Sequence, residues 1–148
     1  MKLVLAGLLL LTTLGAAGAP ASRLDPAPSV AAQDARPVYV VYYWRARPGK
    51  AAEYAAYIRN VAEPIDEDAR KAGVFDEVRT YTPAIVTGAA GADWTHMRVF
   101  KLKSLAAWDA FSAGMDAATK RLYPDERTRP RSDDLRDLVR QELWREFR

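Results

Sequence analysis

The segment Val38–Arg45, with the sequence VYVVYYWR, constrains the fold of this chain more than any other feature. β-Branched and aromatic residues fill it almost without interruption, which is typical of a strand. Because apolar residues occupy both alternating sets of positions, the segment predicts a strand that is buried on both faces. The chain must therefore place a sheet between two covering layers.

A helix is predicted from Ala51 to Ala72, after a turn at Arg47–Lys50. Its apolar residues recur at steps of three and four and form one stripe, which consists of Tyr54, Ile58, Val61, Ile65 and Ala69. Gly73 stands where a helix C-cap is expected. Pro64 lies inside the run, and its ring collides with the carbonyl four residues earlier, so we expect a kink or a break there.

Two more strands and a second helix follow this segment. The strands are predicted at Phe75–Thr82 and Asp93–Leu102, joined as a hairpin by the loose connection Pro83–Gly91. The second helix is expected over Leu105–Leu122, with Ser104 as its N-cap. Its apolar face would comprise Leu105, Trp108, Phe111, Met115, Ala118 and Leu122.

The C-terminal segment leaves two interpretations open. Apolar residues at positions 135, 138 and 139 suit a short helix capped by Ser132, and residues 141–147 could either prolong that helix or form a closing strand. A closing strand gives the order βαββαβ, the ferredoxin-like arrangement of the α+β class. Helices then cover one face of an antiparallel sheet, and the aromatic strands indicate that a partner covers the other.

Residues 1–21 have the pattern of a cleavable secretory signal. Lys2 supplies a positive start, Leu3–Leu14 is an apolar run of signal length, and small residues up to Ala21 offer a cleavage site. The apolar run is too short to cross a bilayer comfortably. Residues 22–36 are interpreted as a flexible leader and residues 37–148 as a single domain. We therefore expect export to the periplasm or the medium, with no membrane attachment after cleavage.

Composition excludes several kinds of chemistry. The chain has no cysteine, which rules out disulfides, zinc–thiolate sites, iron–sulfur clusters and thiol catalysis. Its net charge is +3, and acidic and basic residues are interleaved without the basic stripe of a nucleic-acid binder. His96 is the only histidine and has no evident second metal ligand nearby. We expect no metal, no cofactor and no nucleic-acid partner.

The segment VYVVYYWRARPGKAAEYAAYI resembles the opening of the dimeric α/β-barrel families, which include antibiotic-biosynthesis monooxygenase-like and NIPSNAP-like proteins. An apolar strand runs through a Pro-Gly-Lys turn into a helix with an early aromatic residue, here Tyr54. Pro64, Gly73 and Trp94 extend the resemblance to small exported members without an assigned role, over about residues 37–122.

This resemblance implies a homodimer packed sheet to sheet, with a ligand-sized cavity in each subunit. Members of these families oxidise aromatic polyketides without a cofactor, degrade haem or have no known activity, so the fold does not select the function. The haem-degrading branch commonly uses a helix-borne histidine as the iron ligand. His96 lies in a predicted strand, which argues against that activity.

The candidate catalytic residues are His96 and Tyr42, as proton-transfer groups. The candidate ligand-binding residues are the pocket-wall aromatics Trp44, Tyr81 and Trp94 and the arginines Arg79 and Arg98, which lie on neighbouring predicted strands and could together meet a carboxylate. Each also has a structural interpretation. The aromatics could pack the core or a dimer interface, and the arginines could pair with strand acids such as Glu77.

Four acidic residues cluster on the first helix: Glu63, Asp66, Glu67 and Asp68. Paired carboxylates can do acid–base work, but basic neighbours at helical spacing offset this cluster, so it is interpreted as a solvated helix face. Three functions remain open. The first is an exported homodimer that binds a small apolar or aromatic molecule without catalysis. The second is a cofactor-independent monooxygenase or oxidase of an aromatic substrate, and the third is an interaction module of the cell envelope.

Overall fold

The computed structural model describes residues 35–86 and 93–147. The predicted signal, nearly all of the predicted leader and residues 87–91 of the predicted hairpin connection lie outside the described residues. The elements follow in the order β1 (Val38–Ala46), α2 (Ala51–Tyr57), η1 (Ile58–Ala62), α3 (Glu63–Lys71), β2 (Glu77–Tyr81), β3 (His96–Leu102), α4 (Ala107–Leu122) and β4 (Arg136–Trp144). None of the helices in the described part has the length and apolarity needed to cross a membrane.

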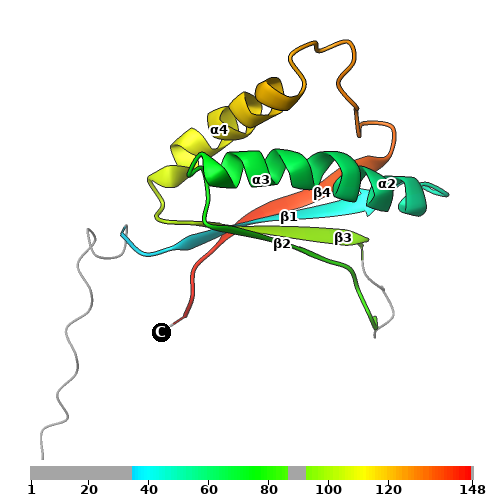
Figure 1. The fold of residues 1–148 in the computed structure, drawn as a ribbon. Helices are drawn as coiled ribbons and strands as arrows, with labels where there is room; N and C mark the ends of the chain where they lie inside the picture. Colours follow the sequence, from blue (N-terminus) through cyan, green and yellow to red (C-terminus); the bar gives the residue numbers. More distant parts are fainter. Residues whose placement is uncertain (1–34, 87–92, 148) are drawn as a thin grey trace, which may run out of the picture.

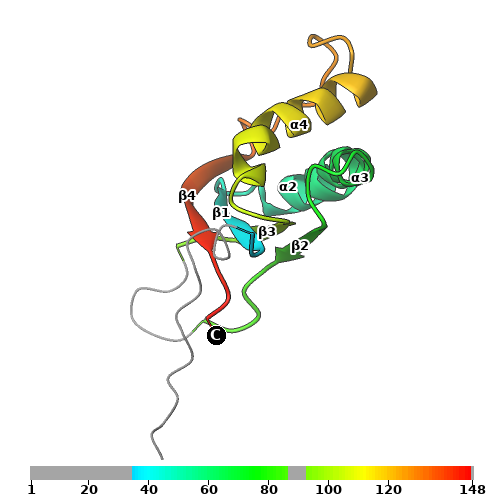
Figure 2. The ribbon, with the colours of Figure 1, turned by 90° about the vertical axis from the view of Figure 1, so that its left-hand side faces the viewer.

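The four strands form one antiparallel sheet in the order β2-β3-β1-β4. The helices all lie over one face of this sheet, as the two perpendicular views show (Figures 1 and 2). This is the ferredoxin-like α+β arrangement, so the predicted fold class is confirmed. The closing strand is the correct interpretation of the C-terminal segment. The short helix that Ser132 was expected to cap does not form, because residues from Arg136 onward pair along the whole edge of β1.

β1 is buried on both faces, as its composition predicts. Val40 faces the helices and Val41 faces away from them, and both have an exposed fraction of 0%. The helix-side core joins apolar residues of β1 and β3 to the predicted stripe of the first helix and to α4. Its buried members include Val38, Val40, Val61, Ile65, Ala69, Phe75, Phe100, Leu102, Phe111 and Ala118.

The first helix neither breaks nor ends at Pro64. Instead the chain winds as a π-helix over Ile58–Ala62, and the N–H of Glu63 donates to the carbonyl of Ile58, five residues earlier. This wider turn relieves the collision that an α-helical turn would create at a proline. Gly73 then ends the helix with a positive φ of 77°, as the sequence predicts.

The second helix starts later than predicted. α4 begins at Ala107, no side chain caps it, and Ser104 contributes only its backbone carbonyl, which accepts from the N–H of Ala107. Leu122, expected on its apolar face, is exposed at the last turn. Gly114 marks the closest approach of this helix to the turn after α3, because a Cβ there would lie 2.6 Å from Val74 Cγ2.

Candidate functional site

Two adjoining pockets lie between the helices and the sheet. The inner pocket, of about 190 Å³, is lined by residues of α2, η1, α3, β3, α4 and β4: Tyr57, Ile58, Ala62, Ile65, Asp66, Arg98, Met115, Thr119 and Arg136. The outer pocket, of about 400 Å³, lies between α3 and β2 and includes Glu63, Val78 and Thr80. Asp66 and Arg98 line both, so this pair of side chains stands where the two pockets meet.

Asp66 and Arg98 form a buried ion pair. Arg98 Nη2 of β3 donates to Asp66 Oδ2 of α3, and the two side chains are 8% and 3% exposed. Asp66 Oδ1 and Arg98 Nε are buried and find no hydrogen-bond partner in the described part of the chain. Burial raises the pKa of Asp66 from 3.8 to about 6, against the lowering effect of Arg98. The prediction that Asp66 lies on a solvated face was wrong, because α3 presses this edge of the helix against β3.

His96 lies beside this pair, on the same face of β3, and is 7% exposed. Its ring meets the ring of Tyr54 edge-on, with centroids 4.7 Å apart, and its Nδ1 lies 2.9 Å from Thr95 Oγ1. Burial lowers the pKa of His96, so the imidazole is neutral at neutral pH. No carboxylate of the described residues pairs with it, which leaves the ring able to exchange a proton but not part of a triad.

Tyr42 and Trp44 lie on the helix face of β1, outside the linings of the two pockets. Their rings stack with centroids 6.0 Å apart, and Tyr42 also meets Phe100 edge-on. Burial raises the pKa of Tyr42, so its hydroxyl stays protonated at neutral pH. Tyr42, Trp44, His96 and Arg98 are therefore the predicted site residues that the fold brings to one face of the sheet.

Arg136 of β4 completes this cluster, and the sequence interpretation missed it. Its guanidinium carbon lies 3.4 Å from the centroid of the Trp44 ring. Its Nη1 donates to the hydroxyl of Tyr54 at 2.9 Å and its Nε to Ser132 Oγ at 3.0 Å. Only the pairing of Ala46 with Arg136 places this side chain over the aromatics, and no local pattern signals that register.

Of the predicted site residues, all of which are described, Arg98 alone lines these pockets, and Arg79, Tyr81 and Trp94 lie on the opposite face of the sheet. Arg79 is paired in register with Val99 and contacts Glu77, so it projects from the opposite face to Arg98 and the two arginines cannot share a carboxylate. Tyr81 is 41% exposed on that opposite face. Trp94 packs against Tyr43, also there, with ring centroids 5.7 Å apart.

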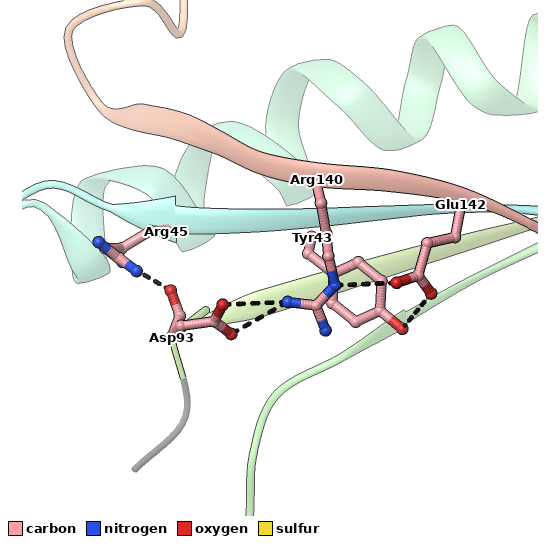
Figure 3. Close-up of polar contacts among 5 residues, drawn as sticks. All are labelled: Tyr43, Arg45, Asp93, Arg140 and Glu142. Carbon is pink, nitrogen blue, oxygen red and sulfur yellow. Dashed lines mark hydrogen bonds and ion pairs between the residues drawn. The ribbon is translucent and has the colours of Figure 1, made fainter. Parts of the chain in front are cut away.

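The opposite face of the sheet carries a polar network that is satisfied within itself (Figure 3). Arg140 lies over the ring of Tyr43, 3.8 Å from its centroid, and donates to Asp93 and to Glu142 at 3.0 and 2.9 Å. The Tyr43 hydroxyl donates to Glu142 at 3.2 Å, and Arg45 donates to the backbone carbonyl of Asp93 at 2.6 Å. Each charge has a partner, so this face offers no free recognition group among these residues.

Comparisons with known proteins identify the fold but no family. No family model and no curated protein matches the sequence. HapK from Hahella chejuensis superposes with a TM-score of 0.51 at 13% identity, over 74% of this chain and 92% of that one. An EthD-like protein from Ralstonia eutropha JMP134 superposes with a TM-score of 0.48 at 14% identity, over 74% of this chain and 90% of that one. An EthD family protein from Bacillus halodurans C-125 superposes with a TM-score of 0.45 at 13% identity, over 75% of this chain and 98% of that one. At such identity the likeness to HapK supports the ferredoxin-like fold alone.

Proposed function

We propose that this chain is an exported homodimeric protein that binds a small, flat apolar or aromatic molecule in the inner pocket. One observation carries the proposal: a pocket with apolar walls on the helices into which polar side chains converge from three elements, α3, β3 and β4. Ligand sites typically combine apolar walls with a few placed polar groups in this way. Tyr57, Ile58 and Met115 supply the apolar walls, while Asp66, Arg98 and Arg136 supply the polar groups.

The dimensions of the inner pocket suit a single aromatic ring. A protein cavity of ~150 Å³ lined by apolar side chains binds benzene, and the inner pocket is about 190 Å³. A π-helical turn contributes Ile58 and Ala62 to its wall, and such turns occur frequently at functional sites. Binding of a one-ring molecule therefore fits both the volume and the construction of the site.

Phenol and toluene are suitable probes for this proposal. Met115→Trp fills the inner pocket from α4, and we expect it to abolish the binding that isothermal titration calorimetry detects in the unchanged protein. Ala117→Trp is the matched control, because Ala117 lies on the same helix as Met115 but is exposed and does not line the pocket. Equal binding of the probes by both variants would remove the inner pocket from the function.

Homodimerisation is proposed through the face of the sheet that no described helix covers. Aromatic side chains remain exposed near its edges, Tyr81 on β2 and Trp144 on β4. Sheet-to-sheet packing would cover them, as the resemblance to the dimeric α/β-barrel families implies. Sedimentation equilibrium should give twice the subunit mass, and Trp144→Glu should shift the protein toward the monomer. A monomer mass for the unchanged protein would exclude this arrangement.

Export is proposed from residues 1–21 alone. Mass measurement of the protein recovered outside the cytoplasm of its own host should show a chain that begins at residue 22. An intact N-terminus on exported protein would contradict cleavage.

A second candidate function is cofactor-independent oxidation of an aromatic substrate, similar to that of the antibiotic-biosynthesis monooxygenase-like proteins. Asp66 favours it, because its Oδ1 is buried without a partner and its pKa of about 6 suits proton removal from a bound phenol. The unchanged protein should consume oxygen with phenolic substrates, and Asp66→Asn should abolish this consumption without loss of substrate binding. Both results together would support oxidation. Oxygen uptake unaffected by this variant would exclude Asp66 as the base.

A further inference from the structure

Arg136 is a half-buried cation that has only neutral partners. Its Nε and Nη1 donate to the hydroxyl oxygens of Ser132 and Tyr54, and its guanidinium stacks on Trp44. Burial raises the pKa of Tyr54, so that hydroxyl carries no charge at neutral pH. Among the described residues no carboxylate lies within ion-pair distance of Arg136.

Within the described ranges, two other arginines pack against aromatic rings of the sheet, and both are neutralised. Arg98 is paired with Asp66. Arg140 provides the closest comparison, because it lies on the same strand as Arg136 and also stacks over a ring of β1, but it bridges Asp93 and Glu142 on the opposite face (Figure 3). Removing a guanidinium from water without a counter-charge is costly, so the lack of an anion at Arg136 is the exception.

Among the described residues, no carboxylate pairs with Arg136 to fill this position. Asp66 is held by Arg98, and the pKa of neighbouring His96 is lowered, which leaves that ring neutral. Asp137, the next residue along β4, pairs with Arg47 at 3.0 Å. Asp66, the one carboxylate among the described residues that line the inner pocket, and Asp137 are thus already engaged, and a bound anion is the counter-charge that the pocket can admit.

We propose that Arg136 binds the carboxylate of a single-ring aromatic acid held in the inner pocket, an inference that rests on the proposed function and names its ligand class. The guanidinium has further N–H groups on Nη1 and Nη2 that find no acceptor among the described residues, and Arg136 lines the pocket. Trp44 covers one face of the guanidinium, so a carboxylate approaches in its plane, in the forked geometry that arginine favours. The ring of the acid then lies against Tyr57 and Met115.

Benzoate and benzamide are the probes that test this proposal, since they have nearly the same shape and differ in charge. Isothermal titration of the purified protein should show that benzoate binds roughly ten- to a hundredfold more tightly than benzamide, the range expected for charge-assisted hydrogen bonds. Arg136→Gln should reduce benzoate binding to the level of benzamide and leave benzamide unchanged. The matched control Arg140→Gln should keep the full preference.

Several outcomes would overturn the proposal. If the unchanged protein binds benzoate and benzamide with equal affinity, no cation selects the ligand and this inference fails. Because both probes still bind in that case, the proposed function would stand. A preference that survives Arg136→Gln would place the anion elsewhere. Absence of binding for both probes and for phenol would defeat the proposed function together with this inference. If Arg136→Gln does not fold, Arg136→Lys, which keeps the charge and loses the fork, should bind benzoate with intermediate affinity, and unchanged affinity would refute a forked contact.

Discussion

Replacement of Asp66 by asparagine tests the electrostatics at the point where the inner and outer pockets meet. Burial raises the pKa of this carboxyl in the folded protein from 3.8 to about 6, with Glu63 adding to the rise and Arg98 opposing it. The folded protein therefore binds this proton more tightly than the unfolded chain does. The stability that results is fully present below about pH 4 and is lost as the pH rises through 6.

The size of the effect follows from the two pKa values. One pKa unit corresponds to ~1.4 kcal/mol, so the difference between 3.8 and about 6 corresponds to roughly 3 kcal/mol. Asparagine at this position does not titrate. The free energy of unfolding of the unchanged protein, minus that of Asp66→Asn, should therefore fall by roughly this amount between about pH 4 and pH 7.

Urea unfolding of both proteins at a series of pH values measures this difference directly, because every other titrating group is common to the two. Glu67→Gln on the same helix is a control, because its difference in the free energy of unfolding should change with pH in the opposite direction. The exposed Glu67 carboxylate has a pKa lowered to about 2, chiefly by its hydrogen bond from Arg70, so its contribution is lost as the pH falls. A difference for Asp66→Asn that rises with pH would show that Arg98 outweighs burial and would refute the reasoning.

Three further substitutions test the packing between the helices and the sheet. Gly114→Ala should destabilise the protein by about 1–3 kcal/mol, because its Cβ meets Val74 at 2.6 Å, and adding Val74→Ala should recover part of this loss; a neutral or stabilising Gly114→Ala would contradict the close approach. Tyr54→Phe should cost about 1 kcal/mol in urea unfolding, since Arg136 loses an acceptor, and unchanged stability would exclude a role for this hydrogen bond. Phe100→Ala should cost about 3–5 kcal/mol as a cavity in the core, and a loss below 1 kcal/mol in thermal or urea unfolding would mean that the site collapses or is not packed as described.

The features that were predicted correctly depend on local patterns. The composition of Val38–Arg45 identified a strand buried on both faces, and the spacing from Tyr54 to Ala69 identified the buried stripe of the first helix. Gly73 ended that helix because a positive φ suits glycine. Each of these signals is contained in one short stretch of sequence.

The features that were missed depend on pairings between distant segments. β4 is a strand because the edge of β1 is available to it, which overrides the helical spacing of Leu135, Leu138 and Val139. The opposed directions of Arg79 and Arg98 follow from the hairpin register, and a shift by one residue would have put both on one face. The burial of Asp66 and the position of Arg136 likewise require knowing which helix edge meets β3 and how β4 aligns with β1.

The most direct test of ligand binding in the inner pocket is native mass spectrometry of the protein purified from its own host. We predict a dimer that carries the extra mass of a small aromatic molecule, which Met115→Trp lacks and the control Ala117→Trp retains. A protein without bound mass that also fails to bind phenol, or a bound mass that persists in Met115→Trp, would contradict the assignment of this pocket.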